Sequence, residues 1–571
     1  YSGAVFLWGT NPADSDNSLF WRTLLKLNRD NTTLVVIDPR RTRTAQIATL
    51  HLAPKPGTDC TLALSIIHCI IAEDRVDHAF IDRWCHGYDE LVEHVRSYTP
   101  EYAQSVTGCP VSDIVQAARI FSEPTPTALL SGRGIDQLGV NTAPTHRALS
   151  ILRAITGDVD RPGACTIMEM SDFIPEIDLE MSDSLTPEQR ATQLNIGHSA
   201  LQSYPGYTGA RQLTERFGKK LPMRYLTSAH PNLVWKAMIS SEPYPIRALI
   251  CMAANPLVTY ADTHLVHQAL HSLDLLVVLE YYLTPTAQLA DYVLPSAGAF
   301  ERPLLQAHGG VANFCYGGAA AVEPYHERRA DYDFFRDLGL RFGQQQQWPD
   351  ETLQRAMERV LEPAGISWEQ WGEQGIYYDT PAYYKQERLD DSGCAQGFST
   401  TTGKIELANE YLAQLGSTRL PEPVSLDEHQ DYPFTMITGA RIQPYWASSY
   451  FNNQRFRQMH PEPTAQMSAT TLKAAGLQAG QWLEVCTARG KARFLAEQAE
   501  IIDGIVSVEY GWWYPEEEQG EPHLSGVWCS NVNLLTSGDV ETSEPLLGSW
   551  TYNGIPCTLR PLEDESGRSP N

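Results

Sequence analysis

Short apolar runs alternate with helical patterns along much of the chain. Ala4–Trp8 and Ala248–Met252 are uninterrupted apolar runs, and each is followed by a stretch with the 3.6-residue period of an amphipathic helix. A second apolar run follows each helix, at 34–37 and 275–279. Runs of this kind favour strands that are buried on both faces. The pattern therefore predicts an α/β fold, with Rossmann-like parallel sheets covered by helices.

The two copies of this strand–helix–strand pattern match each other in detail. The first strand runs into Asn11-Pro12 in one copy and into Asn255-Pro256 in the other. The second strand ends in an acidic residue, Asp38 or Glu280. A Thr-Ala-Gln-apolar-Ala segment then follows at 44–48 and at 286–290. Because the offset between the copies stays near 242 to 244 residues, we interpret the pattern as an internal duplication.

A duplicated unit of this kind predicts two nucleotide-like binding sites. Ligands of open parallel sheets gather at the carboxyl ends of the strands. The N-terminus of a helix there suits a phosphate, and an acidic residue at the next strand end can accept hydrogen bonds from a ribose or a base. The alternative is that Asn-Pro only makes a turn and that the acidic residues only cap helices. Neither loop contains a G-x-G-x-x-G or Walker A motif, which disfavours a nicotinamide or flavin dinucleotide in its usual cradle.

Two further segments carry candidate residues. Gly57 would permit a close backbone approach, and Asp59 would lie on the first turn of the apolar helix 60–72, where it is either a ligand or simply an acidic cap. Asn531 and Asn533 lie two residues apart between apolar neighbours. This alternation predicts a strand that presents both amides on one side, an arrangement that suits a heterocyclic ligand.

The chain divides into three predicted domains. Residues 1–163 hold the first α/β unit, 164–420 hold the second unit with insertions, and 421–571 form a C-terminal domain that begins after a linker rich in proline and acidic residues. In that last domain, short apolar runs separated by glycine turns predict a β-barrel. Their positions are 434–438, 482–487, 492–496 and 505–510.

Composition narrows the function further. The formal charge of −26 over 571 residues excludes a generally basic nucleic-acid surface, and the absence of an 18-residue apolar run excludes direct membrane insertion through a helix. The eleven cysteines show no C-x-x-C spacing. The sequence begins with Tyr1 and not with Met, and a buried strand is expected from Ala4 onward. We therefore interpret the sequence as a fragment whose signal, and hence periplasmic or cytoplasmic location, is not observable.

At this level of detail the chain resembles the molybdopterin oxidoreductases of the dimethyl sulfoxide reductase type. The motifs that carry the resemblance span the chain in the family's order: 9–12, 36–42, 56–59, 254–257, 284–295, 402–406 and 530–533. Within the family, the segments 84–91, 151–155 and 301–303 are most similar to the acetylene-hydratase-like branch.

The resemblance implies a cofactor and its site. Family members bind two pyranopterin guanine dinucleotides around one molybdenum or tungsten, and their C-terminal barrel is of the double-psi type. Gly9, Asn11, Asp38, Arg40, Gly57 and Asp59 would hold one dinucleotide, and Asn255, Glu280, Thr284 and Asp291 the other. Gly439, Arg441, Ser448, Asn531 and Asn533 would close the barrel over the pterins. No residue of this sequence is assigned as a metal ligand or as catalytic.

The resemblance also implies parts that this sequence does not carry. Family members have an N-terminal 4Fe-4S domain and a protein ligand to the metal, which we expect to precede Tyr1. An iron–sulfur electron-transfer subunit and a membrane anchor subunit, as in anaerobic respiration, are the partners implied. Three functions follow as alternatives: an oxidoreductase that transfers electrons or an oxygen atom to or from a small substrate, a non-redox tungsten hydratase, and an inactive cofactor-binding remnant.

Overall fold

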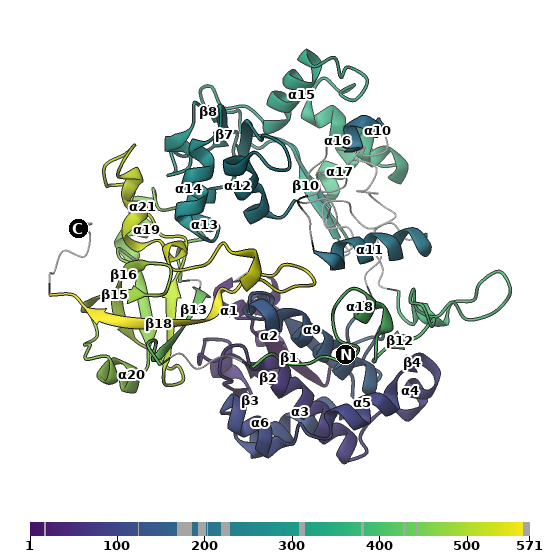
Figure 1. Cartoon of the computed structure of the whole chain (residues 1–571). Coiled ribbons are helices and arrows are strands. Elements are labelled where there is room, and N and C mark those ends of the chain that lie inside the picture. The colour runs from purple at the N-terminus through teal and green to yellow at the C-terminus, as the bar shows by residue number, and fades with distance from the viewer. Residues whose placement is uncertain are drawn as a thin grey trace.

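The fold is described from a computed structural model. It covers residues 1–15, 19–123, 125–167, 186–191, 201, 204–218, 229–307, 314–378, 382–425, 430–440 and 442–563. Two α/β units and a β-barrel are grouped around the middle of the molecule (Figure 1). The first unit is purple to blue in that view, the second is teal, and the barrel is green to yellow.

The first unit is built on a four-stranded parallel sheet. Its strand order is β3 (Leu50–Leu52), β2 (Thr33–Ile37), β1 (Ala4–Trp8), β5 (Thr127–Ser131). Alternate residues of β1 point to opposite faces. Phe6 packs in the core beneath α3 (Asp59–Ala72), α7 (Val111–Phe121) and α9 (Thr142–Ile155), whereas Leu7 packs with Leu24 of α2 (Leu19–Arg29) on the other face. The predicted covering of both faces is confirmed.

The second unit has three parallel strands, but the prediction that its first strand is buried on both faces is wrong, since Cys251 is buried whereas Ile250 and Met252 are exposed. The strand order is β6 (Ala248–Met252), β7 (Leu275–Glu280), β8 (Tyr292–Pro295). Strand pairing follows the same register, since Ala4 pairs with Thr33 in the first unit and Ala248 with Leu275 in the second. Helices α12 (Pro231–Ser240) and α14 (Thr263–His271) pack in its core.

The C-terminal domain contains a closed six-stranded barrel, which confirms the predicted fold class. Its order is β13 (Phe434–Ala440), β17 (Ile505–Glu509), β14 (Thr464–Met467), β16 (Lys491–Gln498), β15 (Trp482–Cys486), β18 (Asn553–Pro561). Four of these strands match the predicted runs, and β14 and β18 are additional. Met436, Phe494 and Val506 are fully buried in the barrel core.

The strand predicted around Asn531 and Asn533 is wrong. Residues Val532–Leu534 form a 3-10 turn, and Asn531 caps it by accepting a hydrogen bond from the Asn533 backbone N–H at 3.0 Å. An asparagine side chain that bonds the backbone two residues ahead favours such a turn over an extended strand. The two side chains therefore do not project in parallel from a sheet.

Part of the segment assigned to the second domain packs on the first sheet's unit. β12 (Ile405–Glu406) pairs with β4 (Cys85–His86). The buried Lys385 Nζ lies 2.5 Å from the buried Asp160 Oδ1. The Asn141 Nδ2 donates to the Val424 carbonyl at 2.9 Å. These contacts place residues 382–425 beside the first α/β unit.

The remaining elements complete the fold, and of these α1, α8 and α13 contribute residues to the site. No helix among the described residues is both long and apolar enough to span a membrane. The other helices and strands are α1 (Pro12–Ser15), α4 (His78–Trp84), α5 (Tyr88–Val95), α6 (Pro100–Thr107), α8 (Arg133–Asp136), α10 (Pro187–Ala191), α11 (Pro205–Arg216), α13 (Pro256–Thr259), α15 (Asp331–Arg341), α16 (Leu353–Leu361), α17 (Trp368–Gln374), α18 (Glu410–Gln414), α19 (Gln454–Met459), α20 (Ala469–Ala474), α21 (Val527–Ser530), β9 (Leu304–Ala307), β10 (Phe314–Gly318) and β11 (Ile376–Tyr378).

Candidate functional site

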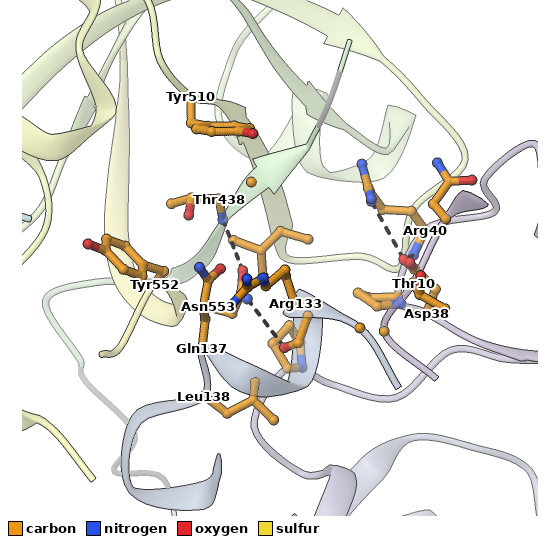
Figure 2. A pocket seen from close by; sticks show the side chains of 18 of the residues that line it. Thr10, Asp38, Arg40, Arg133, Gln137, Leu138, Thr438, Tyr510, Tyr552 and Asn553 are labelled. Carbon is orange, nitrogen blue, oxygen red and sulfur yellow. Dashed lines mark hydrogen bonds and ion pairs between the residues drawn. The ribbon is translucent and has the colours of Figure 1, made fainter. Parts of the chain in front are cut away.

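A cavity of about 590 Å³ lies at the carboxyl end of the first sheet, where the barrel and the end of α13 meet it. Figure 2 shows its lining from close by, with Asp38 and Arg40 on one side and Thr438, Tyr552 and Asn553 on the other. The lining residues are Gly9, Thr10, Asn11, Asp14, Ser15, Ile37, Asp38, Pro39, Arg40, Pro54, Pro56, Asp59, Gly132, Arg133, Gly134, Gln137, Leu138, Thr259, Tyr260, Ile437, Thr438, Gly439, Tyr510, Val532, Asn533, Trp550, Tyr552 and Asn553.

Two glycine loops form the floor of the cavity. Gly9 follows β1 with φ +60°, and its carbonyl accepts a hydrogen bond from the Gly134 backbone N–H at 3.0 Å. A Cβ on Gly134 would lie 2.8 Å from that carbonyl oxygen, and one on Gly132 would lie 2.5 Å from the Thr10 Cβ. Side chains larger than hydrogen therefore cannot be placed there without moving the backbone. The glycines therefore let the loops after β1 and β5 pack against each other at the wall of the cavity.

Acidic and basic side chains stand beside these loops. The Asp38 Oδ1 accepts a hydrogen bond from the Arg40 backbone N–H at 2.9 Å and lies 3.5 Å from the Arg40 Nε. The Asp59 Oδ1 accepts a hydrogen bond from the Trp8 Nε1 at 2.7 Å. Burial raises the pKa of Asp59 to about 6, although the Trp8 hydrogen bond opposes the rise. Arg133 also lines the cavity, and its Nη1 lies 3.6 Å from the Asp136 Oδ2.

The duplication extends to the hydrogen bonds of the asparagine loops. The Asn11 Oδ1 accepts from the Thr44 hydroxyl at 2.7 Å, and the Asn255 Oδ1 accepts from the Thr286 hydroxyl at the same distance. The amide nitrogens differ. The Asn11 Nδ2 donates to Asp14 Oδ2 at 2.7 Å, whereas the Asn255 Nδ2 is buried and has no hydrogen-bond partner among the described residues. An orphaned buried donor of this kind is costly unless a ligand accepts from it.

The other predicted residues of the second unit are engaged within it. The Glu280 Oε1 accepts from the Tyr281 N–H at 2.7 Å, and burial raises the pKa of Glu280. The Thr284 hydroxyl accepts from the Ala287 N–H at 3.3 Å. The Asp291 Oδ2 accepts from the Leu276 N–H at 2.7 Å, which fixes the spacing of β7 and β8.

The barrel is joined to the glycine loops by main-chain and amide hydrogen bonds. The Tyr552 and Asn553 N–H groups both donate to the Gln137 carbonyl at 3.1 Å. The Asn553 Nδ2 donates to the Gly134 carbonyl at 3.3 Å, and its Oδ1 accepts from the Thr438 N–H at 3.1 Å. Asn553 therefore connects the first α/β unit with strand β13 and closes one side of the cavity.

The two asparagines expected to face a heterocycle instead attach the barrel domain to the second unit. The Asn531 Nδ2 donates to the Leu257 carbonyl at 3.1 Å and to the Thr263 hydroxyl at 2.9 Å. The Asn533 Nδ2 donates to the Val258 carbonyl at 2.7 Å. These amide donors are used inside the protein, although Asn533 still lines the cavity.

The predicted site residues therefore separate into two groups. Those that line the cavity are Gly9, Asn11, Asp38, Arg40, Asp59, Gly439 and Asn533. Those that do not are Gly57, Asn255, Glu280, Thr284, Asp291, Ser448 and Asn531, and Arg441 lies outside the described residues. Sequence reasoning missed the contributions of Gly132, Arg133, Gln137 and Asn553. The Gly132-Arg133-Gly134 segment, which follows the apolar residues Leu129-Leu130, was the available signal.

The lining fits a phosphorylated nucleotide group. Main-chain glycines allow a diphosphate to approach closely, arginines supply positive charge, and a carboxylate beside the loop can accept hydrogen bonds from a ribose or a guanine edge. In the second unit, the buried Asn255 Nδ2 is a hydrogen-bond donor that has no acceptor among the described residues. Both observations suit the cofactor that the resemblance implies.

Comparison with known proteins agrees with this assignment. Residues 1–341 match the model of the molybdopterin oxidoreductase family, and residues 434–545 match that of the molybdopterin dinucleotide-binding domain. Acetylene hydratase of Syntrophotalea acetylenica is 31% identical over 533 residues, which cover 90% of this chain and 71% of that protein. Formate dehydrogenase H of Escherichia coli (strain K12) is 28% identical over 536 residues, covering 89% of this chain and 68% of that protein.

A solved structure extends the similarity to the fold. Acetylene hydratase from Pelobacter acetylenicus superposes with a TM-score of 0.88 at 28% sequence identity, covering 98% of this chain and 78% of that one. The family model alone covers more than half of the residues. The chain therefore belongs to the molybdopterin oxidoreductase family.

Proposed function

We propose that the chain is the cofactor-binding part of a catalytic subunit that carries a bis-molybdopterin guanine dinucleotide with molybdenum or tungsten. In this proposal the enzyme transfers electrons or an oxygen atom to or from a small substrate. The observation that carries it is the cavity with two glycine loops, bounded by Asp38, Arg40 and the barrel. The family match supports the same cofactor.

Within this proposal the first unit holds one dinucleotide. The main chain at Gly9, Gly132 and Gly134 would lie against the diphosphate, because these glycines line the cavity and carry no side chain that would hold a ligand away from the backbone. Asp38 would accept hydrogen bonds from the guanosine, and the Arg40 side chain beside it would orient that carboxylate. The barrel residues Thr438 and Asn553 would cover the ligand from the opposite side.

The second dinucleotide is assigned to the second unit by the duplication. Asn255 occupies the place of Asn11, and Glu280 occupies the place of Asp38. The buried Asn255 Nδ2 supplies a donor that has no acceptor among the described residues. When bound, the metal and its dithiolenes supply the oxygen-atom or electron chemistry, and the protein supplies orientation and exclusion of water.

Metal and nucleotide analysis of the full gene product tests the proposal. Protein purified without oxygen should contain molybdenum or tungsten near one per chain by mass spectrometry, and acid hydrolysis should release about two GMP per metal. Asp38→Asn should lower the nucleotide content, whereas Asp89→Asn, an exposed carboxylate on α5, should not. Zinc alone, no metal, or release of a different nucleotide would contradict the proposal.

A non-redox hydratase is the second candidate, and the similarity to acetylene hydratase in sequence and in fold favours it. In such an enzyme the metal activates water for addition to a carbon–carbon triple bond. Conversion of acetylene to acetaldehyde in the absence of any electron acceptor would support the hydratase. Activity that depends strictly on a dye acceptor would support the oxidoreductase instead.

The proposal includes partners of one class. Relatives include the alpha subunit of an F420-dependent formate dehydrogenase of Methanococcus maripaludis, whose name denotes one subunit of a larger enzyme. We propose an iron–sulfur electron-transfer subunit as the partner of the oxidoreductase. Co-purification of a tagged chain with an iron-containing subunit tests this, and a hydratase that works alone does not need one.

A further inference from the structure

Three side chains with metal-binding atoms meet on the surface between the second α/β unit and the C-terminal domain. The Nε2 atoms of His267 and His271 lie 2.8 Å and 2.7 Å from the Glu521 Oε1. The two imidazole nitrogens lie 3.1 Å from each other. In the part of the chain that the structure describes, this is the one such group of three or more His, Cys, Asp or Glu.

The histidines belong to one helix face. They are four residues apart on α14, and this spacing brings side chains together on the same side of a helix. It is also the spacing with which helical histidine pairs bind zinc. The side chains are 25% exposed for His267, 50% for His271 and 43% for Glu521, so that water can reach the three ligand atoms.

Glu521 is held in place from both sides by the second unit and by its own domain. The Gly520 N–H before it donates to the Gln288 Oε1 at 2.9 Å. The Pro522 carbonyl after it accepts from the Trp528 Nε1 at 3.0 Å. The Trp528 ring in turn packs edge-on against His267, with ring centroids 5.1 Å apart. The Glu521 segment and the His267 imidazole are thus positioned by the same tryptophan.

The three atoms form a triangle that suits a small tetrahedral cation. Zinc binds imidazole nitrogen and carboxylate oxygen at about 2.0–2.2 Å. The three ligand atoms form a triangle with edges of 2.7 to 3.1 Å, so a zinc ion at this distance from each atom would lie just above the plane of the triangle. Both imidazoles converge on a single carboxylate oxygen and bring their nitrogens close together, which a shared cation explains better than two separate hydrogen bonds. Because the three side chains are partly exposed, water can occupy the fourth coordination position of the ion.

We propose that His267, His271 and Glu521 bind a zinc ion that links helix α14 to the segment 511–526 of the C-terminal domain. The three residues are absent from the lining of the molybdopterin cavity, so this metal is additional to the molybdenum or tungsten. Its role is to fasten the second α/β unit to the domain that closes the cavity. Zinc binding requires the imidazole nitrogens to be deprotonated.

Metal analysis of the purified holoenzyme tests the proposal. After dialysis against a chelator, titration with zinc chloride should restore one zinc per chain in addition to molybdenum or tungsten. Cobalt in place of zinc should give the visible absorption of a tetrahedral site. His271→Ala and the milder Glu521→Gln should each weaken zinc binding by at least about tenfold. Zinc should raise the thermal unfolding midpoint of the wild type and not that of either variant.

His78→Ala is the matched control. The His78 Nε2 lies 2.7 Å from the Asp74 Oδ1 on an exposed surface, so it offers the same pair of groups without a third ligand. This variant should keep the full zinc content. The proposal is overturned if the wild type takes up no zinc and gives no cobalt absorption, or if His78→Ala loses as much zinc as His271→Ala. Neither result depends on the molybdopterin assignment.

Discussion

The Trp8 Nε1 donates a hydrogen bond to the Asp59 Oδ1 across 2.7 Å, joining the last residue of β1 to the first turn of α3. Both residues are buried, and Asp59 also lines the cavity. The indole therefore holds a carboxyl at the carboxyl edge of the sheet, where its ionisation is costly because water is largely excluded.

Asp59 should make the stability of the cofactor-free protein depend on pH. Its pKa is raised by burial from 3.8 to about 6, so the folded protein binds this proton more tightly than the unfolded chain does. The stabilisation is complete below about pH 4 and is lost as the pH rises to about 6. Asp59→Asn should therefore gain stability relative to the wild type between pH 4 and 7, by up to about 3 kcal/mol. Urea unfolding across this range measures the difference.

Trp8→Phe provides the companion measurement. Removing the hydrogen bond that lowers the pKa of Asp59 should move the pH-dependent loss of stability to higher pH. An unchanged pH profile in both variants would show that Asp59 does not govern it.

Lys385→Met should be strongly destabilising. Its ammonium lies 2.5 Å from the Asp160 Oδ1, and both side chains are buried. Removing one partner leaves a buried charge uncompensated, which costs about 3–5 kcal/mol. The double variant Asp160→Asn, Lys385→Met should recover part of the loss in a double-mutant cycle of unfolding free energies.

The exposed pair of Arg355 with Glu358 is the control for that cycle. Arg355→Ala should change the free energy of unfolding by less than about 1 kcal/mol. If Lys385→Met and Arg355→Ala lower the free energy of unfolding equally, burial does not decide the cost of breaking these ion pairs.

Gly134→Ala should disturb the floor of the cavity. The new Cβ would lie 2.8 Å from the Gly9 carbonyl oxygen, so the two loops must separate. We expect a loss of about 1–3 kcal/mol in stability and a lower content of bound metal. Gly372→Ala, in helix α17 with no atom within 4 Å of the new Cβ, should be neutral or slightly stabilising. Full metal content in Gly134→Ala would argue against a cofactor at this loop.

Asn531→Ala should weaken the attachment of the barrel domain to the second unit, even without cofactor. It removes donors to the Leu257 carbonyl and the Thr263 hydroxyl, leaving a buried acceptor unpaired. A cost of about 1–3 kcal/mol is expected in thermal or urea unfolding of the cofactor-free protein. Asn452→Ala, at an exposed position, should cost much less. If Asn531→Ala changes cofactor content alone, the asparagine contacts ligand and not the second unit.

The sequence pattern was sufficient for the repeated units because their strands are apolar on both faces. β1 and β6 could be located to the residue, and each pairs with the second strand of its own copy of the repeat. β14 and β18 were not predicted, since Thr464–Met467 is short and half polar and β18 contains two prolines. A closed barrel supplies these strands with partners that no local pattern reveals.

The site was harder to predict than the fold. Asp38 and Arg40 follow a strand, so topology alone placed them at the cavity. Gly132 and Gly134 lie 94 residues after Asp38 and Arg40 respectively, and they reach the site only because β5 pairs with β1. The turn at Asn531 depends on one side-chain hydrogen bond that competes with an extended strand, and an alternating pattern does not distinguish the two.

Strand β18 pairs with both β13 and β15, so this one strand closes the barrel. Asn553, which begins that strand, also binds the loop at Gly134. Separation of β18 from its neighbours would open the barrel and remove one wall of the cavity at the same time. The integrity of the barrel and the shape of the cavity therefore depend on the same strand.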